Sequence, residues 1–215
     1  MKYAKTLGLA AVAAAALMVF LGASTASATV LCATEPVEGS PATKGTVCPA
    51  NFAYPAGTEF HAVLDPGTVS KTTSETFNSE CKKSTIKGKT ENEGSATETV
   101  GITVEALTFE ECNCEYKVLK TGTIEIHWIK DTFNGTVTWN GMEKTVLCNS
   151  IFGPIHCIYV TNNTDIGELT GGNPATLDVD AKLPWLSTSG LCTEHTWEAK
   201  YEITAPKPLY VAAHT

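Results

Sequence analysis

The chain has 215 residues, a formal net charge of −8 and fifteen basic residues, all of which are lysine. This composition argues against a nucleic-acid-binding protein, because affinity for phosphates requires clustered cations and arginine is the side chain that grips a phosphate with two parallel hydrogen bonds. Beyond residue 28 no apolar run is long enough for a membrane helix, so we expect no membrane span.

The first 28 residues have the pattern of a secretory signal peptide. Lys2 and Lys5 form a short basic region, an Ala-rich apolar stretch follows over 7–22, and small residues at 26–28 match a cleavage site. Cleavage would change the net charge from −8 to −10, because two lysines and no acidic residues are removed. We therefore expect a secreted, extracellular protein, with association to the cell surface as an alternative.

The body of the chain is predicted to be one domain with an arm. Segment 29–58 contains four prolines and is predicted to be an extended N-terminal arm, whereas 59–215 is predicted to be a single domain. Alternating apolar residues predict strands over 60–64 and 100–106. Between them, 67–97 is polar, so we expect any strands there to be edge strands with weakly fixed register, and whether they are well ordered stays open.

Later segments show the period-two alternation of half-buried strands. It is clearest over 175–183 and 196–204, where apolar side chains share one face and charged side chains the other, and it recurs over 124–128. The chain contains many β-branched residues, and Gly and Pro mark the expected turns. We therefore predict about ten strands in an all-β, antiparallel β-sandwich stapled by disulfides.

Two glycine-containing turns are expected to reverse the chain. Asn140-Gly141 predicts a two-residue hairpin loop that pairs Trp139 with Met142, because a type I′ turn needs positive φ at both central residues. Thr121-Gly122 is expected to reverse the chain between 116–120 and the strand at 124–128.

The eight cysteines all lie beyond the expected signal peptide and are predicted to form disulfides. The paired Cys-x-x-Cys spacing of zinc sites is absent. The two cysteines on either side of Asn113 point to different partner strands, because a ring closed over one residue would be strained. The expected pairs are Cys32 with Cys48, Cys157 with Cys192, and Cys81 and Cys148 with Cys112 and Cys114, in an order that the sequence leaves open.

Two histidine-containing pairs are the weak candidates for chemistry. Glu125 and His127 lie on one outward strand face, where they can share a proton, as a hydrolase requires, or a metal ion. His156 and His195 flank the expected Cys157–Cys192 bond, which would bring them together as a metal candidate. A solvated strand face explains the first pair equally well.

Oxygen ligands for Ca²⁺ are the other metal candidate. Asn162, Asn163 and Asp165 cluster in one expected loop, and Asp178 and Asp180 project from the outer face of a strand. No spaced calcium motif is present, so whether Ca²⁺ binds stays open, and we expect no cofactor.

Trp185 is the candidate ligand contact. It follows a proline at the edge of a Ser-rich loop, where an exposed indole can stack on a sugar ring or on another subunit. Packing of a half-buried hinge is the alternative explanation.

The second half of the chain resembles a group of exported, disulfide-containing β proteins of soil actinobacteria that have no known function. The resemblance covers about 107–211 and implies a secreted bacterial β protein, but it brings no activity, cofactor or site residues. The stretches that carry it are LTFEEC from Leu107, VLKTGTIEIH from Val118, NGTVT from Asn134, HCIY from His156, TDIGELTG from Thr164 and ATLDV from Ala175.

These observations favour an exported, non-enzymatic protein that acts at or outside the cell surface by binding or by assembly. The candidate partners are a cell-wall polysaccharide and a second copy of the chain. A secreted hydrolase that uses Glu125 and His127, and a structural subunit of a surface matrix, are the alternatives.

Overall fold

The computed structural model describes residues 29–38, 46–49, 51–95, 97–150, 153–186 and 190–214, so the expected signal peptide lies outside the described residues. The described residues form strands and connecting turns, and none of them belongs to a helix that could cross a membrane. The strands are β1 (Thr29–Cys32), β2 (Val37–Glu38), β3 (Thr46–Val47), β4 (Glu59–Leu64), β5 (Ser70–Thr73), β6 (Asn78–Thr90), β7 (Val100–Cys112), β8 (Glu115–Lys120), β9 (Thr123–Trp128), β10 (Gly135–Asn140), β11 (Glu143–Ser150), β12 (Gly153–Val160), β13 (Thr164–Thr170), β14 (Thr176–Leu183), β15 (His195–Ala205) and β16 (Tyr210–Ala213).

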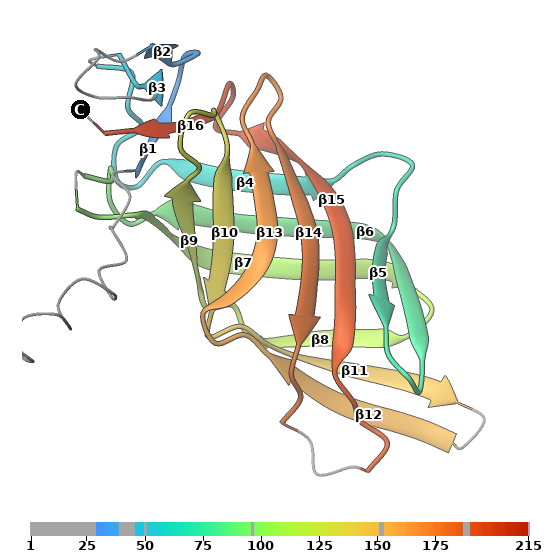
Figure 1. Cartoon of the computed structure of the whole chain (residues 1–215). Coiled ribbons are helices and arrows are strands. Elements are labelled where there is room, and N and C mark those ends of the chain that lie inside the picture. The colour runs from blue at the N-terminus through green and yellow to red at the C-terminus, as the bar shows by residue number, and fades with distance from the viewer. Residues whose placement is uncertain are drawn as a thin grey trace, which may run out of the picture.

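The largest sheet is a closed antiparallel barrel (Figure 1). Its strand order is β14-β13-β10-β9-β7-β6-β4-β15, and the last strand, β15, pairs with the first, β14, which closes the ring. β5 occupies the same position in the sheet as β4, because it also pairs with both β15 and β6. The prediction of an all-β, antiparallel fold is confirmed, but the prediction of a β-sandwich is wrong. Inward and outward residues alternate in the same way in both architectures, and closure depends on β15 finding partners along both edges.

The polar segment 67–97 is central to the barrel, so the expectation of edge strands there is wrong. It contains β6, which pairs with β7 along one edge and with β4 and β5 along the other. Its buried side chains include the small polar residues Ser79 and Ser84. These residues are buried because they hydrogen-bond inside the protein: the Ser84 hydroxyl bonds the Tyr201 hydroxyl at 2.8 Å.

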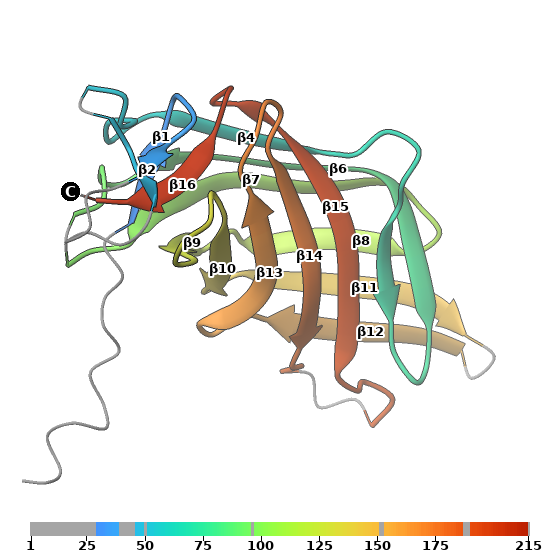
Figure 2. The same ribbon diagram turned by 45° about the horizontal axis from the view of Figure 1, so that its top comes forward.

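A second sheet of three strands, in the order β12-β11-β8, crosses β14 and β15 (Figures 1 and 2). The chain passes between this sheet and the barrel at 113–114, 121–122, 141–142 and 161–163, and the last three of these passages lie at one corner. There Gly122 lies against the backbone of Gly141 and Met142, and the Gly141 N–H donates to the Thr161 carbonyl at 3.0 Å. β8, β11 and β12 therefore start or end at a shared corner.

The chain bends at Asn140-Gly141, but Gly141 alone has positive φ there, and the predicted two-residue hairpin is wrong. Trp139 on β10 pairs with Ile124 of β9 and Thr164 of β13, while Met142 donates its N–H to the Thr161 hydroxyl at 2.9 Å. The turn thus carries the chain from one sheet to the other. Thr121-Gly122 also carries the chain between the two sheets, because β8 pairs with β11 whereas β9 pairs with β7 and β10.

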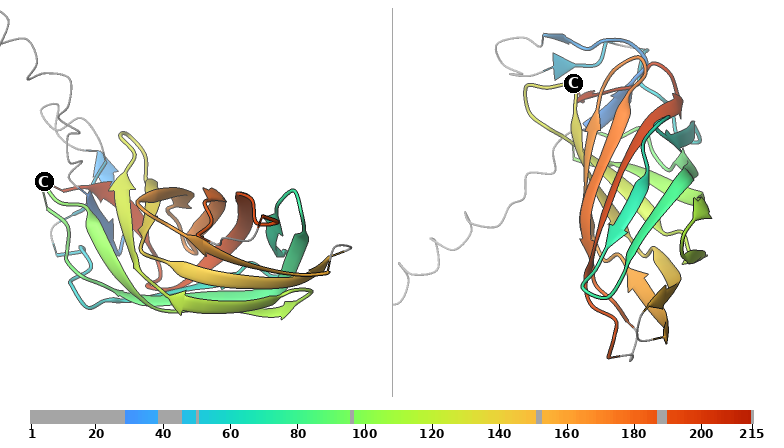
Figure 3. Two further views of the ribbon diagram at one scale, coloured as in Figure 1. Left: turned by 90° about the horizontal axis from the view of Figure 1, so that it is seen from below. Right: turned by 90° about the vertical axis from the view of Figure 1, so that its right-hand side faces the viewer.

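Residues of the expected N-terminal arm form part of a small sheet at one end of the barrel (Figures 1 and 3). Its order is β1-β16-β3-β2, with β1 antiparallel to β16. Val30, Cys32, Cys48 and Ala212 form its buried cluster. Leu31 points the other way, into the main core. The arm is therefore anchored to the last strand of the chain.

One continuous core fills the barrel and extends to the inward face of the three-stranded sheet. Its largest fully buried rings are Trp139, Trp197, Tyr159 and Tyr201. Trp139 and Trp197 meet inside it, with 6.1 Å between ring centroids. The two sheets consequently share their apolar interior.

All eight cysteines are in disulfides. The expected pairs Cys32–Cys48 and Cys157–Cys192 are present. The order left open by the sequence is resolved as Cys81–Cys112, between β6 and β7, and Cys114–Cys148, within the three-stranded sheet. Cys157–Cys192 joins β12 to the segment before β15, so it ties the three-stranded sheet to the barrel.

Serine substitutions at the two adjacent cysteines test this map. Cys112→Ser should release one thiol, at Cys81, and Cys114→Ser should release one at Cys148, because each loses a different partner. Alkylation under non-reducing denaturing conditions followed by peptide mass spectrometry identifies the released thiol. Release of Cys148 by the first variant and of Cys81 by the second would contradict the pairing.

A glycine substitution tests the shared corner. Gly122 has φ of 68°, and an added Cβ would collide with the carbonyl oxygen of Asn140. Gly122→Ala should lower the free energy of unfolding by on the order of 3–5 kcal/mol, since strain and a backbone clash combine. The matched control is Gly153→Ala, where φ is 101° but no atom lies within 4 Å, and about 1–2 kcal/mol of strain alone is expected. Equal losses for both variants in denaturant unfolding would contradict a crowded corner.

Candidate functional site

Glu125 and His127 lie together on the outward face of β9. The Glu125 carboxylate is 3.7 Å from His127 Nε2, and both side chains are partly exposed. Their partners on β10 are Thr138 and Thr136, which do not titrate. The pair therefore has the proximity expected from the sequence, with no third reactive group directly opposite it on β10.

The second histidine pair, His156 and His195, is not brought together. His156 on β12 is exposed, on the outward face of the three-stranded sheet, whereas His195 is 1% exposed and packs on the inward-facing ring of Tyr159. The disulfide that was expected to bring the histidines together is present, but their side chains lie on opposite sides of the sheet.

The oxygen-rich residues are engaged in local structure. The Asp165 carboxylate accepts the N–H of Gly167 at 3.1 Å, and the Thr164 hydroxyl accepts the N–H of Asn162. Asp178 forms an ion pair with Lys200 at 3.8 Å on the outer face of β14 and β15. Across the described part of the chain, no group of three His, Cys, Asp or Glu side chains is arranged to hold a metal ion.

Trp185 is 43% exposed and follows β14. Its backbone forms an isolated bridge with Tyr159 at the edge of β12, and Leu186, the next residue, is 62% exposed. The indole is thus available at the surface, while its backbone is part of the three-stranded sheet's edge.

The least expected group in the interior is a lysine. Lys144 on β11 is completely buried. Its Nζ lies 4.4 Å from the ring centroid of Trp197, 5.1 Å from that of Phe109 and 5.7 Å from that of Tyr116. Such cation–π contacts favour the ammonium by about 2 kcal/mol or more when they are desolvated. They do not replace the hydrogen bonds that the ammonium loses on leaving water.

Two more polar side chains adjoin this lysine. Tyr159 stands directly opposite Lys144 in the β11–β12 register, so their Cβ atoms are about 5 Å apart. The His195 ring packs edge-on against Tyr159, with 3.8 Å between centroids. His195 lies two residues before Trp197 on β15 and therefore shares its inward face. We call Lys144, Tyr116, Tyr159 and His195, with the rings of Phe109 and Trp197, the Lys144 cluster.

In the described part of the chain, five of the eight buried polar side-chain atoms that lack a hydrogen-bond partner belong to this cluster. Among the described residues, none forms a hydrogen bond with Lys144 Nζ, the Tyr159 hydroxyl or either ring nitrogen of His195. The Tyr116 hydroxyl also lacks a bond of good geometry, although the hydroxyls of Ser79 and Thr72 lie near it.

Several other buried polar groups have partners, although His61 Nε2 and the hydroxyls of Thr73 and Thr193 also lack one. The Trp139 indole donates to the Thr121 carbonyl at 2.7 Å, and the Trp197 indole donates to the Ser70 hydroxyl at 2.9 Å. Because a buried polar group without a partner costs about 1–3 kcal/mol, several at one place call for an explanation.

Burial sets the protonation of the cluster. It lowers the pKa of Lys144 to about 7. It also lowers the pKa of His195 to about 2, with the charge of Lys144 acting in the same direction. Burial raises the pKa of Tyr159, and the neighbouring Tyr116 adds to this. At neutral pH the cluster therefore combines a neutral imidazole, two phenols that donate protons, and an amine divided between its neutral and charged forms.

Strand parity contains the signal that would have found this lysine. Met142, Val146 and Cys148 are apolar residues of one parity, and Lys144 lies between the first two at the same parity. The aromatic partners are not visible in this way, because Phe109, Tyr116 and Trp197 come from three other strands. The alternation along the strand thus predicts that the Lys144 amine is buried, but it does not predict which side chains surround it.

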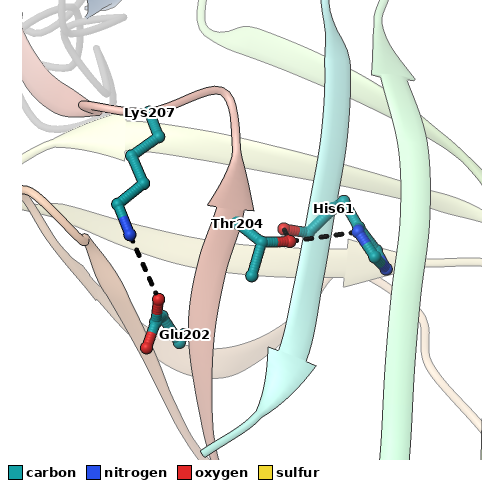
Figure 4. A network of polar contacts seen from close by, with 4 residues as sticks. All are labelled: His61, Glu202, Thr204 and Lys207. Carbon is teal, nitrogen blue, oxygen red and sulfur yellow. Dashed lines mark hydrogen bonds and ion pairs between the residues drawn. The ribbon is translucent and has the colours of Figure 1, made fainter.

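A surface hollow near His61 is a weaker candidate. The His61 ring Nδ1 lies 3.0 Å from the Thr204 hydroxyl, which also donates to the His61 carbonyl, and Lys207 pairs with Glu202 nearby (Figure 4). Burial, with the charge of Lys87, lowers the pKa of His61. These contacts join β4 to the end of β15 and have a structural explanation.

No protein-family model, curated protein or solved structure matches the chain. The resemblance to exported actinobacterial proteins therefore stays a prediction, and the interpretation of the site depends on its geometry.

The Lys144 cluster predicts how stability depends on pH. The folded pKa of Lys144, about 7, is below its ordinary value of 10.5, so between these values the unfolded chain binds more protons. The free energy of unfolding should rise with pH from about 7 to about 10, by on the order of 3–5 kcal/mol. Above about pH 10 it should fall, because burial raises the pKa of Tyr116, Tyr159 and Tyr201 and only the unfolded chain ionises them.

Denaturant unfolding of the disulfide-bonded protein at pH 6 to 9.5, with Lys144→Met beside the wild type, measures this effect. The variant should be more stable than the wild type at pH 6 and lack the rise. Below about pH 6.5 both should lose stability, because the folded pKa of His195 is about 2 and only the unfolded chain gains that proton. A wild-type profile that follows the Lys144→Met profile from pH 6 to 9.5 would contradict a buried amine.

Proposed function

We propose that this chain is an exported, non-enzymatic binding protein that acts outside the cell and holds a small organic ligand at the Lys144 cluster. The observation that carries the proposal is the group of unpartnered polar atoms on Lys144, Tyr159 and His195, all within the core. A ligand with an oxygen acceptor would hydrogen-bond the amine and the phenol, and its apolar part would contact the surrounding rings.

Stability does not explain why a lysine occupies this position. An apolar side chain of similar length would fit between Met142 and Val146 without the cost of a buried amine. Residues that lower stability are often tolerated where they serve a function. The four disulfides support an extracellular location, and the signal-like sequence at 1–28 points the same way.

The surrounding scaffold suits a rigid binding site. The cluster draws side chains from β7, β8, β11, β12 and β15, which are all hydrogen-bonded within sheets. The site is thus placed on strands rather than on loops, which favours a fixed geometry.

Binding of propionate at pH 6 tests the proposal. At this pH the Lys144 amine is mainly charged, and a carboxylate supplies the missing acceptor for it. At ten times the dissociation constant, propionate should stabilise the wild type by about 1.4 kcal/mol, which raises the unfolding temperature by several degrees. The indole N–H signal of Trp197 in NMR spectra should shift with the same saturation curve.

Lys144→Met should abolish both effects, whereas Lys117→Met should keep them. Lys117 is the matched control, because it lies on the exposed face of the adjacent strand β8. Equal responses of the two variants would overturn the site at Lys144. Loss of a hydrolytic activity in Glu125→Gln with unchanged folding would instead favour the hydrolase alternative.

A further inference from the structure

The geometry of the Lys144 cluster points to covalent capture: we infer that the Lys144 amine condenses with the carbonyl group of a small aldehyde or ketone and holds it as an imine. This inference rests on the proposed binding function and specifies the class of ligand. It starts from the surroundings of Nζ, which has three aromatic rings near it and, among the described residues, no carboxylate or other hydrogen-bond partner.

The amine is available as a nucleophile because of where it lies. Other lysines of the described chain form ion pairs, as Lys120 does with Glu143 at 2.7 Å. Lys144 has no such partner in the described chain, and burial lowers its pKa to about 7. At pH 7 about half of its population carries a free lone pair, roughly a thousand times the fraction of an ordinary exposed lysine.

The groups that face the amine from the packed strands suit the rest of the reaction. Tyr159 on β12 and Tyr116 on β8 are protonated phenols, and β15 contributes the neutral imidazole of His195. β7 contributes Phe109, which does not titrate. No anionic side chain of these strands contacts Nζ, so nothing competes with a ligand for the amine.

The reaction balances without a further reagent. The lone pair of Nζ attacks the carbonyl carbon, and an amine proton moves to the oxygen to give a carbinolamine. The hydroxyl then leaves as water, with a proton from the Tyr159 phenol, and a C=N bond forms. Loss of the remaining N–H proton to the phenolate restores the phenol and leaves a neutral imine. One water is released, and nothing is oxidised or reduced.

The aromatic rings stabilise the charged form of the product. While the iminium exists, its positive charge lies against the faces of Trp197 and Phe109. The enclosed position of Nζ excludes bulk water, which slows hydrolysis of the imine. The same enclosure predicts slow loading, because the three-stranded sheet must move away from β15 before a ligand reaches the amine.

Reductive trapping with propanal and sodium cyanoborohydride at pH 7 tests the inference on the native, disulfide-bonded protein. Peptide mass spectrometry should show propylation at Lys144 at least tenfold above that at Lys117 while total labelling is low. The preference should disappear in denaturant, because unfolding exposes Lys144 and removes the burial that lowers its pKa. Tyr159→Phe should slow labelling of Lys144 several-fold and leave labelling of Lys117 unchanged.

The aldehyde and the carboxylate with the same three carbons separate the two proposals. Labelling of exposed lysines with none at Lys144, together with Lys144-dependent binding of propionate, would overturn the imine and leave the binding function intact. Failure of both probes would overturn both. Labelling of Lys144 that reaches the same level in Tyr159→Phe at the same rate would remove the role of the phenol.

Discussion

The pairing of β15 along both edges is the constraint on which the rest of the structure depends. On one edge it bonds β14 over its first eight residues, from His195 to Glu202, and on the other it meets β5 and then β4. This double pairing converts a row of strands into a ring. It also fixes the inward face of β15, and so directs His195, Trp197 and Tyr201 into the interior.

The second constraint is the corner at which the three-stranded sheet leaves the barrel. Gly122 and Gly141 pack against each other there, and a side chain at Gly122 would collide with the neighbouring backbone. The end of β8, the start of β11 and the end of β12 meet at this corner. β11 lies between β8 and β12, and Lys144 meets β15 from the opposite layer. The cluster is thus a product of two sheets that share one core, and neither sheet contains it alone.

Much of the local structure could be predicted from the sequence, because it depends on neighbours in the chain. The alternation over 175–183 and 196–204 corresponds to β14 and β15, and Gly122 and Gly141, which were expected in turns, both have positive φ. The architecture could not be predicted, because closure depends on which strands pair over long separations. The predicted hairpin at Trp139 is wrong for this reason: the chain bends at Gly141, but the partners of Trp139 come from β9 and β13.

The candidate site shows the same division. The weak pairs chosen from the sequence are neighbours along a strand or flank a cysteine, and the structure places them on the surface or on opposite faces. The Lys144 cluster combines residues separated by up to 88 positions, from Phe109 to Trp197. A lysine among inward-facing residues is visible in the sequence, whereas its cage is a property of the packed sheets.

The Cys157–Cys192 bond has a consequence for how the cluster can open. It is the one disulfide among the four that connects the three-stranded sheet to the segment leading into β15, beside the contact of Tyr159 with His195. The same edge of β12 is also held by backbone hydrogen bonds, from the Val160 N–H to the Pro184 carbonyl at 3.1 Å and from the Leu186 N–H to the Ile158 carbonyl at 2.9 Å. The disulfide adds a covalent link to this hydrogen-bonded edge, so once the thiols are oxidised any separation of β12 from β15 must bend the sheet away from the side of Cys157.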